Sequence, residues 1–242
     1  MLHKAAFAST SEIARSVHKG LTNILESLQV VSKKNLGNVL EILVYNWLKI
    51  RLDVAGDTMK DGVSLATIFA LVKTERRLFP DEFRPLLQQP LKYSNLITVT
   101  LSTNSYDDRK GSRAELENIE VSNLDPVALI QPAVGESWDV GLKLLFPDRG
   151  APLYIFIELK SRDVTEGKSR KKVDMKYKGP PPSQYNNTAT VMDGTEFFYI
   201  SMSTRVDESR TVDRCILLGQ TAVYRFMGQV KGMYEALRGA MS

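Results

Sequence analysis

Hydrophobic residues recur every three or four positions in three segments of the chain, a spacing that predicts amphipathic helices. The segments are residues 10–31, 36–50 and 221–241. The second has an apolar stripe wide enough to lie across a sheet, and we expect shorter helices over 61–73 and 81–87. The apolar side of the last segment is broad, so we consider it a candidate homodimer interface.

Short apolar runs with strand character fill most of the remaining chain. They lie at 94–102, 127–134, 139–146, 152–160, 196–203 and 214–218, and we expect 103–118 to be a loop with at most one helical turn. This order of helices and strands predicts an α/β fold with a mixed central sheet flanked by helices. Residues 1–105 would form a helical part on or beside a core of residues 106–242, either as an accessory lobe or as part of one domain.

The composition is that of an ordinary globular protein, with 242 residues of which 43% are hydrophobic and 25% are charged. The single cysteine, Cys215, excludes an intrachain disulfide and a cysteine-based zinc site. No run of eighteen apolar residues predicts a membrane helix. We therefore expect an intracellular protein, cytoplasmic or nuclear, without a membrane partner.

Several catalytic classes have no support in the sequence. His3 and His18 both lie near the N-terminus, so catalysis centred on histidine is not expected. The chain contains no glycine-rich phosphate loop, no Gly-x-Ser-x-Gly elbow and no His-Glu-x-x-His pair. ATPase, serine hydrolase and zinc protease activities are accordingly not predicted.

Two charged residues close the most apolar of the predicted strands. In a strand over 152–160, Glu158 and Lys160 point to the same face because side chains alternate. A hairpin through the turn at 147–150 would bring Asp139 beside them. Two carboxylates and a lysine suit Mg²⁺ or Mn²⁺ bound together with a phosphate, since hard cations prefer oxygen ligands.

Alternative assignments of these residues stay open. Glu136 or Asp148 could replace Asp139 as the ligand, and Asp139 would then only begin a strand. Glu158 and Lys160 could also form a surface pair where the strand emerges into solvent. Nearby polar residues such as Lys143 are candidate phosphate neighbours.

The spacing of Asp139, eighteen further residues and then Glu158-Leu159-Lys160 resembles the PD-(D/E)XK restriction-endonuclease-like nuclease family. In that family an acid opens the second core strand and an acid-x-lysine triplet closes the third. The resemblance covers about residues 36–205 and implies a restriction-endonuclease-like core with Mg²⁺-dependent endonuclease activity. It implies catalytic roles for Asp139, Glu158 and Lys160, with the two acids as metal ligands.

The same resemblance extends to a glutamate on the predicted helix 36–50. Glu41 matches the family's helical glutamate, which implies catalytic and metal-binding roles for it. The chain departs from the family pattern at Trp138, where proline is usual, and in the ninety-seven residues that separate Glu41 from Asp139. The layout is also similar to the nuclease-like C-terminal domains of Crinkler and RHS-type effectors.

A basic segment follows the Glu-x-Lys strand directly. Residues 162–178 contain seven basic and three acidic residues, an excess equal to the net charge of +4 for the whole chain. Such a segment favours a polyanion, and we expect a nucleic acid, DNA first. The candidate contacts are Arg162, Lys168, Arg170, Lys171 and Lys172, although 168–172 fits a nuclear import signal or a charged loop equally well.

Two further expectations concern the region after this segment and the activity itself. By the resemblance, Gln184, after the proline run at 180–182, is a candidate polar residue of the active site. The alternative to a nuclease is a catalytically inactive module that binds nucleic acid or protein on the same fold.

Overall fold

A computed structural model describes residues 20, 36–58, 61–102, 109–132, 138–160, 196–204, 206–212 and 215–241. Apart from Gly20, the predicted helix over 10–31 lies outside these residues, as do the basic segment and the proline run.

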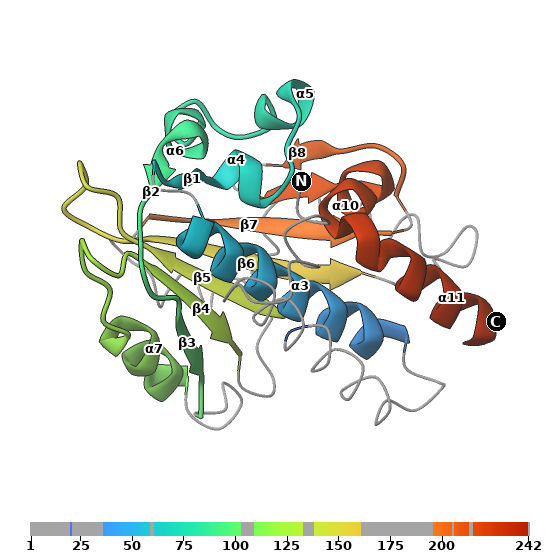
Figure 1. Ribbon diagram of the computed structural model, residues 1–242, viewed down its shortest axis with the longest axis horizontal. Helices are drawn as coiled ribbons and strands as arrows, with labels where there is room; N and C mark the ends of the chain where they lie inside the picture. The colour runs from blue at the N-terminus through green and yellow to red at the C-terminus, as the bar shows by residue number, and fades with distance from the viewer. Residues whose placement is uncertain are drawn as a thin grey trace.

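A seven-stranded mixed sheet forms the centre of the fold (Figure 1). Its spatial order is β3 (Ile97–Thr100), β4 (Val127–Gln131), β5 (Val140–Leu144), β6 (Leu153–Lys160), β7 (Glu196–Ser203), β9 (Cys215–Leu218) and β8 (Arg210–Val212). Neighbours β4, β5 and β6 are antiparallel, as are β9 and β8, whereas β3–β4, β6–β7 and β7–β9 are parallel. The predicted α/β class with a mixed central sheet is confirmed.

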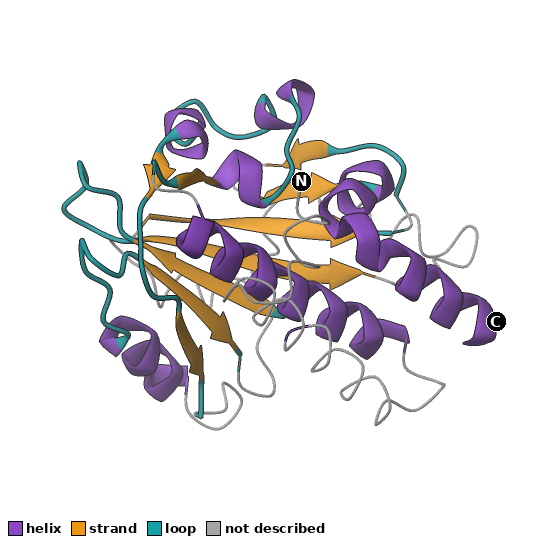
Figure 2. Ribbon diagram, in the orientation of Figure 1, coloured by secondary structure: helices purple, strands orange, loops and turns teal. Residues whose placement is uncertain are grey.

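Helices pack around this sheet, and the longest lies across it (Figure 2). They are α3 (Leu36–Thr58), α4 (Leu65–Ile68), α5 (Lys73–Arg76), α6 (Arg84–Gln88), α7 (Arg109–Asn118), α10 (Gln220–Met227), the 3-10 turn η1 (Gly228–Val230) and α11 (Lys231–Met241). Strands β1 (Val63–Ser64) and β2 (Pro90–Leu91) pair antiparallel beside α4 and α6. No described helix combines the length and the apolar character that a membrane crossing requires.

Side-chain alternation divides the buried residues into two clusters, one on each face of the sheet. Ile155 and Ile157 of β6 belong to the cluster that contains the apolar stripe of α3, and we call this side the α3 face. Tyr154 and Phe156 belong to the cluster that contains Leu116 of α7, and we call this side the α7 face. The predicted orientation of the 152–160 strand is therefore confirmed.

The α3-face cluster joins the two ends of the chain in one core. It draws on residues from Val39 to Tyr234 and so includes both sides of position 105. Helix α3 continues to Thr58, beyond the predicted end at residue 50, because Leu52, Val54 and Ala55 extend its buried stripe. These contacts fix α3 against the same sheet that carries Glu158.

Residues 61–73 do not form the single helix that their pattern predicts. Gly62 has φ of +86°, a conformation that suits glycine, and the chain then pairs as β1. Ser64 begins α4 by accepting a hydrogen bond from the Thr67 N–H at 3.3 Å. Ala70, with φ of +53°, lies just after α4, so the helix cannot continue.

Helix α7 was expected to be a loop with at most one turn, but it runs for ten residues. Its sequence is too polar to reveal a helical period, and tertiary contacts stabilise it instead. Strands β1, β2 and β8 were also missed, because runs of two or three residues carry almost no periodic signal.

The predicted C-terminal helix is broken at Gly228, whose φ is +53°. The break produces α10, η1 and α11. The apolar side that suggested a dimer interface is buried inside the chain at Val223, Phe226, Met227, Val230 and Tyr234. Trp47 of α3 donates its indole N–H to the Phe226 carbonyl at 2.7 Å, which ties α3 to α10.

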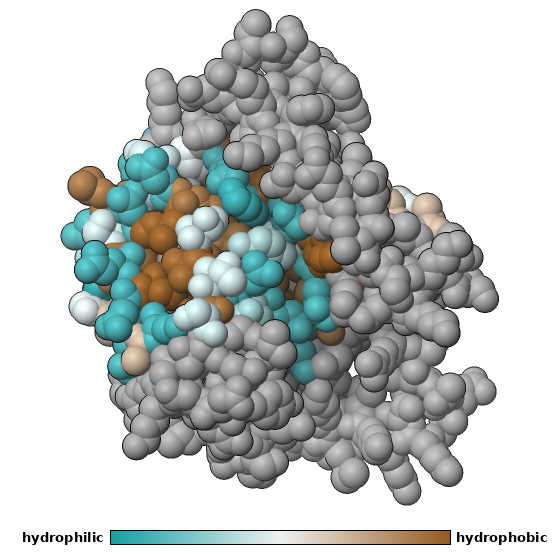
Figure 3. Space-filling model, turned by 90° about the horizontal axis from the view of Figure 1, so that it is seen from below, coloured by the Kyte–Doolittle hydropathy of each residue, from teal (hydrophilic) through white to brown (hydrophobic). Residues whose placement is uncertain are grey.

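The described surface mixes hydrophobic and hydrophilic residues (Figure 3). On the face drawn there, apolar groups reach the surface between polar ones. Among the described residues, the large hydrophobic side chains counted as exposed are Val72 and Leu124.

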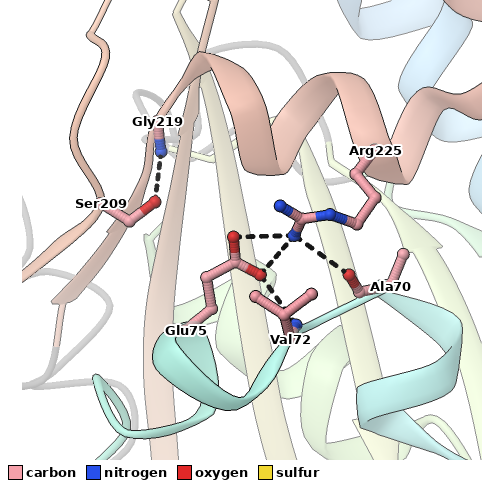
Figure 4. A network of polar contacts seen from close by, with 6 residues as sticks. All are labelled: Ala70, Val72, Glu75, Ser209, Gly219 and Arg225. Atoms are coloured by element: carbon pink, nitrogen blue, oxygen red, sulfur yellow. Dashed lines mark hydrogen bonds and ion pairs between the residues drawn. The ribbon is translucent and has the colours of Figure 1, made fainter.

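One ion pair joins the α4–α6 segment to helix α10 (Figure 4). Arg225 Nη1 lies 2.8 Å and 2.6 Å from the two carboxylate oxygens of Glu75. Glu75 also accepts a hydrogen bond from the Val72 N–H at 2.9 Å, and its side chain is only 9% exposed. A carboxylate this buried needs its partner, since an unpaired buried charge is strongly destabilising.

We expect the Arg225→Met variant to be about 2 to 3 kcal/mol less stable than wild type, because Glu75 would stay buried without its cation. The matched control is Lys49→Met, which breaks the more exposed Lys49–Asp53 pair of α3 and should change stability by less than about 1 kcal/mol. Urea unfolding of wild type and both variants measures these changes in the free energy of unfolding. Equal losses in the two variants would contradict the assigned role of the Glu75–Arg225 pair.

Candidate functional site

The strand directions bring the ends of several strands to one edge of the sheet. Parallel strands β6, β7 and β9 all finish there, and antiparallel β5 begins there. We call this the carboxyl edge and define it by Asp139, Lys160, Ser203 and Leu218. In open α/β sheets, ligands bind outside the carboxyl ends of the strands.

Asp139 lies against Glu158 at this edge. The register pairs Val140 with Ile157, which places Asp139 opposite Glu158 one residue further on. The Asp139 N–H donates to the Ile157 carbonyl at 2.8 Å, and Asp139 Oδ2 accepts from the Leu159 N–H at 2.6 Å. Asp139 therefore bonds to the residues on both sides of Glu158. The predicted hairpin and the proximity of these two acids are present in the structure.

A tryptophan–glycine contact sets the position of Asp139. Trp138 is buried on the α7 face, with its ring centroid 5.1 Å from that of Phe156. A Cβ added to Gly141 would lie 2.9 Å from the Trp138 ring, so the ring occupies the space that any other residue would fill. The residue before Asp139 is thus anchored in the core.

Glu158 continues a row of residues across three strands on the α7 face. Phe156 and Tyr199 are register partners, and the next pair toward the carboxyl edge on that face is Glu158 and Ser201. We call Asp139, Glu158 and Ser201 the polar row. Glu158 is 6% exposed and Ser201 1% exposed, so these two are buried beside aromatic rings, whereas Asp139 is half-buried.

Lys160 is the last residue of β6, two positions beyond Glu158, and its register partner is Ser203. Its backbone is described, whereas its side chain lies outside the described part. Its predicted position at the rim, two residues beyond Glu158, agrees with the observed strand.

Glu41 lies near the start of α3, which packs on the opposite face of the sheet from Glu158. Within the described residues, no group of three or more histidine, cysteine or acidic side chains is close enough to hold a metal ion. Asp139 and Glu158 are therefore the pair that the structure brings together. A contribution of Glu41 stays a prediction.

The other candidates divide into those outside the described part and those engaged elsewhere. Outside it lie Glu136, Arg162, Lys168, Arg170, Lys171, Lys172 and Gln184. Asp148 lies between β5 and β6, at the far end of the hairpin from Glu158, and accepts a hydrogen bond from Gln89 Nε2 at 3.1 Å. It is not placed to share an ion with Glu158.

Lys143 does not serve as a phosphate neighbour. Its Nζ donates to the carbonyls of Leu116, Glu117 and Ile119, at 3.1, 3.0 and 2.7 Å. It thereby satisfies the C-terminal end of α7, whose last carbonyls lack helical partners. Burial lowers the pKa of Lys143, and the charge of Glu117 opposes that shift.

Two serines that the sequence patterns did not single out also lie at this site. Ser201 and Ser203 alternate with Met202 near the end of an apolar strand, the same period-two signal that identified Glu158 and Lys160. Small hydroxyl residues are common in strands, so the pattern alone did not distinguish them. Their register partners on β6, Glu158 and Lys160, distinguish them from other serines.

Comparisons of the chain with protein-family models, curated proteins and solved structures found no match. The chemistry therefore has to be argued from the residues themselves. Each carboxylate offers about four lone-pair positions, and the Leu159 N–H uses one of those on Asp139. Two adjacent carboxylates with this capacity fit a hard cation that completes its shell with water and phosphate.

The packing below the site makes one prediction about alkaline stability. Burial and the charge of Glu117 raise the pKa of Tyr154 to about 12. An unfolded chain loses this proton near pH 10. The contribution of protonated Tyr154 to the stability of the fold is therefore complete below pH 10 and is lost as the pH rises toward 12.

Urea unfolding across this pH window should show a steeper loss of stability for wild type than for Tyr154→Phe, which cannot ionise. Parallel curves would show that Tyr154 ionises in the fold as it does in the unfolded chain.

Proposed function

We propose that this protein is a metal-dependent nuclease that hydrolyses phosphodiester bonds, with DNA as its substrate. The observation that supports this best is the contact of Asp139 with both neighbours of Glu158 at the carboxyl edge. Glu158 is buried beside a second acid, and like charges at close range repel. A bound cation removes that repulsion.

The connectivity supports a PD-(D/E)XK type of nuclease. Helix α3 is followed along the chain by the antiparallel strands β4, β5 and β6 and then by β7, parallel to β6. An acid precedes the second strand of this meander, and Glu158-Leu159-Lys160 closes the third. This is the placement that the sequence motif requires, so the fold supports a restriction-endonuclease-like core.

Asp139 and Glu158 hold Mg²⁺, or Mn²⁺ in its place, through their carboxylate oxygens. The ion, when bound, would offset negative charge on a phosphate oxygen and lower the pKa of coordinated water. Lys160 orients the attacking water and offsets negative charge that develops on the phosphate. Glu41 holds a water near the metal or the metal itself, and Gln184 and Glu136 are further candidates of the same site.

The basic residues after β6 contact the phosphate backbone of the substrate. Arg162, Lys168, Arg170, Lys171 and Lys172 follow the Glu-x-Lys triplet directly along the chain. Contacts of this kind bind without reading sequence and weaken as salt is added. We therefore infer that affinity for DNA depends on ionic strength.

A second candidate function is a binding module without catalysis, and one observation favours it. Asp139 Oδ2 accepts the Leu159 N–H, so this carboxylate has a structural role in the hairpin whether or not a metal binds. A module of this kind would bind DNA or a protein with no need of a cation.

Cleavage of supercoiled plasmid in the presence of Mg²⁺ tests the first proposal. Glu158→Gln and Lys160→Met should each reduce the cleavage rate by about 10²- to 10⁴-fold, because each removes a group that acts on the reacting phosphate or water. Glu82→Gln is the control, since Glu82 is an exposed acid of the α5–α6 connection. It should cleave like wild type.

Wild type that leaves duplex and single-stranded DNA and RNA intact with both Mg²⁺ and Mn²⁺ would rule out the nuclease. Calorimetric titration of Mn²⁺ into wild type and Asp139→Asn separates the two candidates. The nuclease requires a heat of Mn²⁺ binding in wild type that is lost in Asp139→Asn. The binding module requires DNA binding that depends neither on Mn²⁺ nor on Asp139.

A further inference from the structure

We infer that Ser201 is a positioning residue of the metal site and holds the Glu158 carboxylate in the orientation that binds the cation. The inference rests on the proposed nuclease function and adds a residue to it. Ser201 acts through Glu158 and is not itself assigned a contact with the metal or the substrate.

The first support is the strand register. Glu158 of β6 and Ser201 of β7 are partners in a parallel pair, and alternation directs both to the α7 face. Partner residues on adjacent strands stand about 5 Å apart, which is within reach of a serine hydroxyl and a glutamate side chain. The two residues were separate in the sequence, and only the pairing of β6 with β7 joins them.

The second support is the apolar character of most other neighbours of Ser201 on that face. Its partner on β9 is Leu217, and Tyr199 precedes it by two residues along β7. Of the two register partners of Ser201, Glu158 is the charged one. Both Glu158 and Ser201 are almost fully buried, so the two residues lie together in a part of the fold that is shielded from solvent.

The third support is the symmetry of the polar row about Glu158. On one side, Asp139 bonds to the backbone on both sides of Glu158. On the other side lies Ser201, the register partner of Glu158 on β7. A glutamate has three side-chain torsions, so a serine hydroxyl that holds its carboxylate would reduce the entropy lost when a cation binds. Groups that orient metal ligands in this way typically change metal affinity or activity by 10- to 100-fold.

The chain offers a matched control just beyond the end of the same strand. Thr204 directly follows β7 and is also fully buried, but its hydroxyl contacts the Tyr234 hydroxyl at 3.1 Å, within the α3-face cluster. Thr204→Val therefore removes a buried hydroxyl three residues beyond Ser201 without touching the polar row.

The experiment titrates Mn²⁺ into Ser201→Ala, Ser201→Thr, Thr204→Val and wild type by calorimetry, with thermal unfolding and plasmid cleavage measured in parallel. Ser201→Ala should weaken Mn²⁺ binding by about tenfold and lower kcat with little change in KM for DNA. Ser201→Thr keeps the hydroxyl and should stay within about threefold of wild type. Thr204→Val should lose thermal stability but keep the wild-type affinity for Mn²⁺.

Two results would overturn the inference while leaving the nuclease proposal intact. One is a wild type that cleaves DNA together with a Ser201→Ala variant of unchanged Mn²⁺ affinity. The other is an equal loss of affinity in Ser201→Ala and Thr204→Val, which would make the effect one of general stability. A wild type that neither binds Mn²⁺ nor cleaves would overturn both proposals together.

Discussion

The pairing of β5 with β6 is the interaction on which the candidate site depends. Asp139 secures it at the carboxyl edge with a backbone donor to Ile157 and a carboxylate acceptor for Leu159. A shift of one residue in this register would turn Glu158 toward the α3 face and separate it from Asp139. The two acids are thus neighbours because the hairpin permits a single alignment of its buried faces.

The aromatic residues beside the polar row explain how that alignment is enforced. Trp138, Phe156 and Tyr199 share one cluster, and the ring of Trp138 uses the space above Gly141. Charges next to such a cluster are poorly screened, so any cation or phosphate there interacts more strongly than it would in water. The same surroundings make an unbalanced charge costly, and the proposed cation would offset the charge of the two acids.

The sequence predicted the hairpin well, because alternation in β6 is unambiguous and the intervening turn is short. It predicted helix α7 poorly, since the helix is held by Lys143 and by its contact with the sheet and not by a periodic stripe. Ser201 could not be assigned from sequence because its significance comes from a partner strand. Residue patterns report local periods, whereas strand neighbours depend on the global topology.

The order of the strands also bears on how the protein folds. Strands β5 and β6 are joined by a short turn, so Asp139 and Glu158 can meet through local contacts. Strand β7 pairs with β6 although residues 161–195 separate the two in sequence, and bringing such distant segments together carries an entropic penalty that grows with the separation. Non-local parallel pairing of this kind slows folding. We therefore expect nascent chains to bring Asp139 and Glu158 together early. Ser201, the third residue of the polar row, would join them only when the sheet is complete.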